Sequence, residues 1–176
     1  SLSCMVSNLT FENKKFSLHK EKHFKASFNL QKLSNELSLL IDQDTNAYKK
    51  IISARRLPKK TKDQIIKRDK ALLNATILAI ETPHKVLELC LKVHKIIFKV
   101  INFINMNCIS DIGAANNCIL SSSKSAYFNI LINLGDINKN QQNKFRESAK
   151  YYIKQVDNYY LQINKIVDKE LGLSND

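Results

Sequence analysis

Two aspartates, Asp42 and Asp44, stand in a long segment of helical periodicity and could do acid–base chemistry. Apolar residues recur three or four positions apart on both sides of them. Asp44 falls on that apolar face, and Asp42 lies roughly 200° around the helix. A carboxylate on a buried face is costly unless paired, and burial raises the pKa of a carboxyl group toward the range useful for a general acid or base. Asp44 is therefore a candidate catalytic residue. The competing interpretation is a buried carboxylate bonded to a helix end or a lysine.

A second polar group, Asn105, Ser110 and Asp111, lies at a predicted break between two helices. Serine and aspartate at such a break commonly cap the following helix. The group is a candidate site only if these side chains also contact a ligand, in addition to capping the helix.

A third group consists of Asn129 and Asn133, which share one helical face among apolar neighbours. Buried amides need hydrogen-bond partners. The two side chains can bond to each other, to a neighbouring backbone, or to the amide edge of a heterocyclic ligand.

A fourth group is basic and covers residues 55–60, with Arg68 in the next predicted helix. Positive charges at the corner between two helices attract carboxylates or phosphates. The alternative is a solvated basic corner without a ligand.

Other kinds of chemistry find little support. His19 and His23 have i,i+4 spacing but lack the glutamate of the zinc-protease motif, and no serine stands in a nucleophile elbow. We expect no metal site. The four cysteines form no CxxC pair, which predicts free, buried thiols and a cytoplasmic location.

Length and composition restrict the fold. The chain has 176 residues, enough for one domain, but only three glycines and two prolines. A β-barrel needs more turn residues, and a nucleotide-binding loop needs clustered glycines, so a mostly helical domain remains. The formal net charge is +12, which suggests a polyanionic partner or lysine spread over solvated faces. Because arginine is scarce, we expect no nucleic acid as a partner, and we expect no membrane either.

The periodicity predicts an all-α fold, a single bundle of five or six helices. The first ten residues resemble the end of a buried helix, and a long helix follows a polar connector and ends at Pro58. Its predicted apolar stripe comprises Phe24, Phe28, Leu33, Leu37, Leu40, Tyr48 and Ile51.

The second half of the bundle begins with a capping box, Thr61 with Gln64, before a helix over 61–81. Thr82 and Pro83 predict the start of another helix, which ends near 104. Further helices are predicted over 111–122, 124–134 and 140–171, with Gly172 as the final cap.

Four segments match the motifs of the cyclodeaminase family in order and spacing. The chain resembles the cyclodeaminase domain of formimidoyltransferase-cyclodeaminases and, more distantly, single-domain methenyltetrahydrofolate cyclohydrolases, over about residues 1–170. The segments are Asp42-Gln-Asp-Thr-Asn-Ala-Tyr48, Ala54-Arg-Arg-Leu-Pro-Lys59, Asn105 through Ser110-Asp111, and Ser125-Ala-Tyr-Phe-Asn-Ile-Leu-Ile-Asn133-Leu-Gly-Asp-Ile137.

The resemblance implies an all-helical homodimer, or a higher homo-oligomer, that converts 5-formimidoyltetrahydrofolate to 5,10-methenyltetrahydrofolate and ammonia. It implies no cofactor beyond the tetrahydrofolate substrate, with or without a polyglutamate tail. The family's catalytic aspartate matches Asp44, and Asp111 is the second residue that the resemblance implies to be catalytic. Arg56 and Lys59 would contact folate carboxylates, and the remaining implied substrate-binding residues are Asn105, Ser110, Asn129 and Asn133.

This sequence also departs from the family pattern. Ile104 and Ser125 stand where the family usually has glycine, and the family's Gly-rich segment is absent before Ser1, so we expect residues 1–176 to form an N-terminally truncated domain. The alternatives are a methenyltetrahydrofolate cyclohydrolase, a non-catalytic helical paralogue, and a basic binding module.

Overall fold

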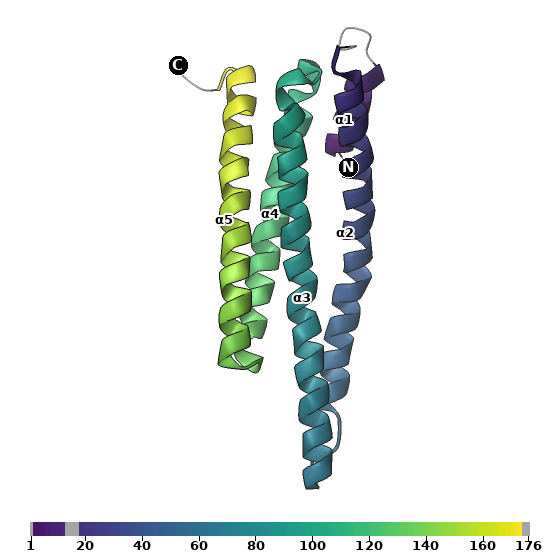
Figure 1. Cartoon of the computed structure of the whole chain (residues 1–176), viewed down its shortest axis with the longest axis vertical. Helices are drawn as coiled ribbons and strands as arrows, with labels where there is room; N and C mark the ends of the chain where they lie inside the picture. The colour runs from purple at the N-terminus through teal and green to yellow at the C-terminus, as the bar shows by residue number, and fades with distance from the viewer. Residues whose placement is uncertain (1, 13–17, 174–176) are drawn as a thin grey trace.

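The chain folds as an elongated bundle of helices (Figure 1). The computed structural model describes residues 2–12 and 18–173, and in these ranges the regular elements are helices only. The α-helices are α1 (Leu2–Glu12), α2 (Lys20–Arg55), α3 (Lys62–Val100), α4 (Ile109–Asn133) and α5 (Lys139–Glu170). Short 3-10 segments lie in the turns: η2 (Ile101–Phe103), η3 (Met106–Cys108) and η4 (Leu134–Asp136). The predicted all-α fold is confirmed.

The central helix is α3, which packs against α2 on one side and against α4 and α5 on the other. The short helix α1 packs on the upper part of α2 and also reaches α4. At the lower end, α2 and α3 extend past the turn between α4 and α5 and form a protruding hairpin (Figure 1). The bundle therefore has a body to which all five helices contribute and an extension formed by α2 and α3.

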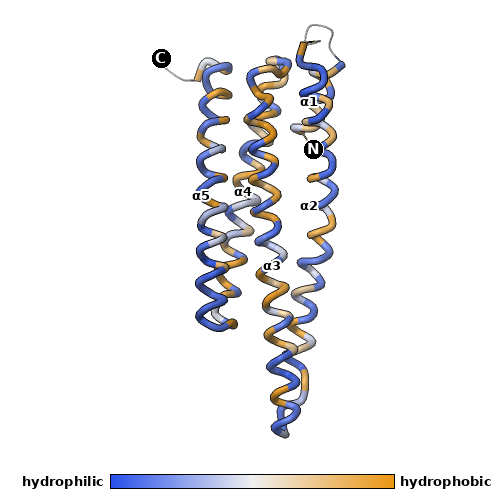
Figure 2. Tube along the Cα trace, viewed as in Figure 1, coloured by the Kyte–Doolittle hydropathy of each residue, from blue (hydrophilic) through white to orange (hydrophobic). Residues whose placement is uncertain are grey.

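The body holds the large aliphatic side chains of the core. One cluster surrounds Leu89, Ile97 and Ile163, and a second surrounds Ile80 and Ile130. The protruding hairpin has a much smaller cluster, built from Ala47, Ile51, Ala75 and Ala79 with Leu72 packed on it. Its lower end is mostly hydrophilic (Figure 2).

Three sequence predictions about the helices were wrong. The helix does not restart at Pro83: α3 runs through it, and Thr82 donates a side-chain hydrogen bond to the carbonyl of Leu78 (2.9 Å) instead of capping. Proline lacks an N–H and costs about 3 kcal/mol inside a helix. Both Thr82 and Pro83 are buried, however, so packing outweighs that cost.

The other two errors concern α4 and the apolar stripe of α2. Residues 109–133 form one helix, α4, where two were predicted. Three residues of the predicted apolar stripe of α2, Phe24, Phe28 and Tyr48, are exposed. The buried face of the upper α2 runs instead through His23, Ala26 and Leu30, and near Tyr48 it runs through Ala47 and Ile51.

The predicted helix ends are mostly confirmed. Thr61 and Gln64 form the capping box at the start of α3, with the backbone N–H of Gln64 donating to the Thr61 hydroxyl (3.3 Å). Gly172 has a φ of +69°, a conformation that glycine adopts without strain, directly after the last turn of α5.

None of the helices in the described ranges is long and apolar enough to cross a membrane.

Candidate functional site

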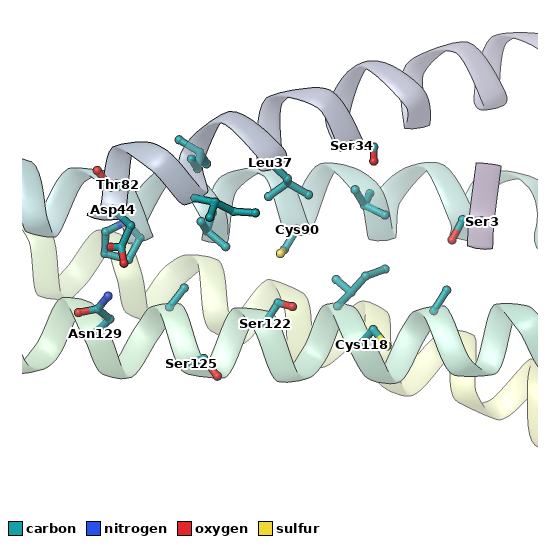
Figure 3. Close-up of a pocket in the computed structure, with 18 of the residues that line it drawn as sticks. Ser3, Ser34, Leu37, Asp44, Thr82, Cys90, Cys118, Ser122, Ser125 and Asn129 are labelled. Carbon is teal, nitrogen blue, oxygen red and sulfur yellow. The ribbon is translucent and has the colours of Figure 1, made fainter. Parts of the chain in front are cut away.

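A groove runs between α2 and α4, with α3 as its floor and α1 at its upper end (Figure 3). Its volume is about 730 Å³, which lies within the range of small-molecule sites. Most of its wall is apolar. The polar or thiol-bearing side chains along it are Ser3, Ser34, Asp44, Thr45, Thr82, Cys90, Cys118, Ser122, Ser125 and Asn129.

Asp44 lines the end of this groove that is remote from α1, on the left in Figure 3, and its carboxylate is directed into the groove. The prediction that Asp44 lies on a buried face was wrong, because the side chain is exposed in the single chain. Leu40 and Ala47, about one turn to either side, are buried against the bundle. Asp44 therefore lies on the predicted face of the helix, but at this position the face borders the open groove and does not pack against a neighbouring helix. Asp42 is also exposed and is absent from the groove lining.

Asn129 lies on α4 at the same end of the groove as Asp44 and Thr82 (Figure 3). Asn133, one turn further on, donates through Nδ2 to the backbone carbonyl of Asn129 (2.8 Å) and to its Oδ1 (3.1 Å). Asn133 does not line the groove. It therefore acts on Asn129, whose own Nδ2 remains the donor that can face the cavity.

Asn105, Ser110 and Asp111 lie at the opposite end of α4. The Asn105 side chain accepts from the backbone N–H of Asn107 (3.2 Å) and caps η3, while the Asn105 N–H donates to Thr10 (3.0 Å). Asp111 is half-buried and Ser110 is exposed in the first turn of α4. None of the three lines the groove. Asp111 and Asn129 are 18 residues apart, about 27 Å along the helix axis.

Arg56 and Lys59 lie in the turn at the tip of the protruding hairpin, and both are exposed. Arg56 is 12 residues beyond Asp44, about 18 Å along α2. The structure therefore brings only Asp44 and Asn129, supported by Asn133, to one place. The other five predicted site residues lie at the two ends of the molecule.

Sequence analysis predicted Asn129 but missed the other small polar side chains that α4 contributes to the groove. Cys118, Ser122, Ser125 and Asn129 follow one another at three- and four-residue spacing along α4. This stripe of small side chains next to an apolar face was a signal available in the sequence. Thr82 was missed because it was interpreted as a helix cap.

The thiols of the groove differ in environment. All four cysteines are free, as predicted, but Cys118 is exposed and only Cys4, Cys90 and Cys108 are buried. Burial raises the pKa of the Cys90 thiol, and a hydrogen bond with Ser123 opposes that shift only in part. Cys90 therefore stays protonated and is a poor nucleophile at neutral pH.

Within residues 2–12 and 18–173, no three His, Cys, Asp or Glu side chains gather as a metal site would require.

Comparisons with known proteins agree on one family. Residues 1–153 match the sequence profile described as Formiminotransferase-cyclodeaminase. The chain is 26% identical to the formimidoyltransferase-cyclodeaminase of Rattus norvegicus over 153 residues, which is 87% of this chain and 28% of the rat protein. It is 27% identical to the Mus musculus protein of the same name, over 78% of this chain and 25% of that protein. The chain thus spans about a quarter of the length of these relatives.

The fold also matches a solved structure, the crystal structure of formiminotetrahydrofolate cyclodeaminase from Thermotoga maritima. The TM-score is 0.84 at 21% sequence identity, and the match covers 97% of this chain and 81% of that one. At that identity the likeness shows the fold alone.

Proposed function

The chain belongs to the formiminotransferase-cyclodeaminase family, and on that premise we propose that it is a folate-acting cyclodeaminase. The reaction converts 5-formimidoyltetrahydrofolate to 5,10-methenyltetrahydrofolate and ammonia. The observation that carries the proposal is a carboxylate, Asp44, at one end of a largely apolar groove of about 730 Å³. Apolar walls with a few convergent polar groups are typical of sites for flat heterocyclic ligands.

In this proposal Asp44 moves a proton between two nitrogen atoms of the substrate. The formimidoyl group enters protonated, as –CH=NH2+. N10 attacks its carbon and forms a C–N bond while the C=N π electrons move to the nitrogen, and the N10 proton passes to the Asp44 carboxylate. The protonated carboxyl group then gives the proton to the formimidoyl nitrogen. The bond between that nitrogen and the carbon breaks, and ammonia leaves. A single carboxylate that acts first as base and then as acid is sufficient for this shuttle.

Asn129 orients the substrate in the same proposal. Its Oδ1 accepts from Asn133, so its Nδ2 is left to donate to a ligand carbonyl in the groove. Asn133 is then a positioning residue for Asn129, because it bonds to Asn129 and does not line the cavity.

We propose a homodimer as the working form. The two helices that flank the groove carry exposed apolar side chains, among them Ile41 in the groove wall of α2 and Phe128 on α4. A second copy packed over this face would bury them. Arg56 and Lys59 lie at one end of the molecule, and Asn105, Ser110 and Asp111 lie at the opposite end. One partner copy would therefore bring only one of these groups to a given site, either the first for the folate carboxylates or the second for the wall. We place the reaction in the cytoplasm, where free thiols persist.

The test compares two matched substitutions in the full-length protein, Asp44→Asn and Asp42→Asn. Ammonia release and methenyltetrahydrofolate formation are measured with 5-formimidoyltetrahydrofolate. Loss of a general acid–base group costs about 10²–10⁴-fold in rate, so we expect at least a 100-fold drop in kcat for Asp44→Asn. Asp42→Asn makes the same chemical change two residues away and should stay within about twofold, because Asp42 is outside the groove.

Two results would contradict this proposal. Wild-type ammonia release by Asp44→Asn, with unchanged helical circular dichroism, would remove Asp44 from the mechanism. If the wild-type protein hydrolyses methenyltetrahydrofolate and releases no ammonia from the formimidoyl substrate, the activity is that of a cyclohydrolase.

A further inference from the structure

The lower end of the protruding hairpin carries most of the positive charge of the chain. We call residues 49–70 the basic tip. It contains ten of the 28 basic residues and two of the 16 acidic ones, a net charge of +8 out of +12. The other 154 residues together carry only +4. Lysine spread evenly over solvated faces does not produce this distribution.

The charges of the basic tip are exposed and almost unpaired. Nine of the ten basic side chains are exposed, and Arg68 is half-buried. Among the described residues, the one ion pair within the tip joins Arg68 to Asp69, with 3.6 Å between Nη1 and Oδ1. Neighbouring like charges destabilise a helix. The tip therefore keeps an unfavourable arrangement that a polyanion would relieve.

The geometry spreads these charges along the hairpin and not only across its end. Lys49, Lys50 and Arg55 lie on α2, and the series from Lys62 to Lys70 covers about 12 Å along α3. The tip projects beyond α4 and α5 (Figure 1). Within the chain, a long and rigid partner can lie alongside it without meeting the rest of the bundle.

Several partners fit this surface poorly. A second copy of the tip is excluded by charge repulsion. A bilayer would meet the end of the hairpin, where Leu57 is half-buried. The exposed apolar side chains of the tip are Ile65 and Ile66 on α3, and two adjacent residues do not form the continuous apolar face that insertion requires. Single-stranded nucleic acid is held by stacking on successive aromatic rings. No aromatic residue occurs within the tip, and Tyr48 stands alone at its edge.

We propose that the basic tip binds the phosphate backbone of double-stranded nucleic acid without regard to sequence. Closely spaced phosphates match rows of exposed lysines, and the low arginine content disfavours the reading of bases. This changes the expectation that nucleic acid is not a partner. That expectation depended on the amino-acid composition of the whole chain. The structure shows that the charge is concentrated in the basic tip, and that the tip extends beyond the body. Arg56 and Lys59 belong both to the tip and to the proposed folate site, so the variant below leaves these two residues unchanged and tests the tip separately from catalysis.

The experiment measures binding of a fluorescent 20-base-pair duplex by anisotropy between 50 and 200 mM salt. The tip variant is Lys60→Gln/Lys62→Gln/Lys67→Gln/Lys70→Gln. The matched control, Lys139→Gln/Lys144→Gln/Lys154→Gln/Lys165→Gln, removes the same charge from exposed lysines of α5. We expect the wild type to bind at micromolar concentrations in low salt. If all four tip lysines contact phosphates, the slope of log K against log salt falls by about 3 to 4 in the tip variant, and the control keeps the wild-type slope.

Three outcomes would overturn the proposal, provided that circular dichroism shows both variants to be folded. Equal weakening in the tip and control variants would mean that net charge alone drives the binding. Binding to phosphatidylserine vesicles but not to the duplex would make an anionic lipid surface the partner. Tighter binding of a single strand than of the duplex would exclude the backbone geometry proposed here.

Discussion

The same two helices, α2 and α3, have different surroundings along their length. In the body they share a core with α1, α4 and α5, and most of the buried residues there are leucines, isoleucines and valines. In the protruding hairpin they pack mainly on each other, and alanines dominate the cluster. Two helices in contact can cover only small side chains, so the remaining positions face solvent. In this protein those positions carry charge in the basic tip, whereas in the body they border the groove.

This difference implies that packing in the body determines the free energy of global unfolding and that packing in the hairpin contributes little to it. Burial of a large aliphatic side chain stabilises a fold by about 1.5–3 kcal/mol, which an alanine cannot supply. Substitutions in the body are therefore expected to change the free energy of unfolding more than substitutions in the hairpin.

The largest effect is expected in the body, for Ile130→Ala. Ile130 is fully buried on α4, and truncation of a buried isoleucine to alanine costs about 2–5 kcal/mol. Ile132→Ala is the matched control, because Ile132 is two residues away on the same helix and 81% exposed in the single chain. Urea unfolding should show a loss of about 3 kcal/mol for the first and less than about 0.5 kcal/mol for the second. Equal losses would show that the Ile132 face is covered in the assembled protein.

A second prediction concerns pH and the buried histidine of the body, His94 on α3. It is fully buried, and neither ring nitrogen has a hydrogen-bond partner of good geometry. Burial lowers the pKa of His94 to about 4, and the neighbouring Asn116 opposes this only in part. The unfolded chain takes up the proton near pH 6.5. Between pH 6.5 and about 4 the unfolded state thus binds a proton that the folded state does not.

The free energy of unfolding should therefore fall as the pH drops through that window, by about 3 kcal/mol in total from this residue. Other groups titrate there too, so the measurement is the difference between the wild type and His94→Leu in urea unfolding at pH 7, 6, 5 and 4. The variant should lose less stability than the wild type at each step down. Parallel curves for the two proteins would mean that His94 is protonated in the fold without cost.

How far the sequence predicts this structure depends on whether the deciding contact is local. The capping box at Thr61, the glycine at 172 and the apolar periodicity are local, and they were predicted correctly. The single helix α4 was not, because the chain 114–123 is rich in serine and asparagine. Ser123 bonds within its own helix, to the carbonyl of Ile119 (2.8 Å), but Asn116 bonds to the carbonyl of Tyr160 on α5 (3.1 Å). The second partner is 44 residues away and is invisible to a local pattern.

The candidate site shows the same limit. The helical face of Asp44 could be predicted from spacing, but whether that face meets a helix or a groove depends on how far α4 lies from α2. Asn129 and Asn133 were correctly expected to bond to each other as one alternative. The separation of Asp111 from Asn129 along α4 could have been predicted only from one continuous helix.

The smallest effect is expected at helix caps, where the two regions can be compared through the same chemistry. Thr61 caps α3 at the tip, and Asn138 caps α5 in the body, each accepting from the backbone N–H three residues on. Substitution by alanine removes about 1 kcal/mol from either cap. For Asn138→Ala the loss should appear in global urea unfolding, because α5 belongs to the body. For Thr61→Ala it should appear as faster amide hydrogen exchange in the first turns of α3, with little change in global unfolding, because the tip can fray without opening the core.

A full loss of 1 kcal/mol in global unfolding for Thr61→Ala would show that the hairpin and the body unfold as one cooperative unit. The contrast between the two regions would then be one of packing only and not of stability.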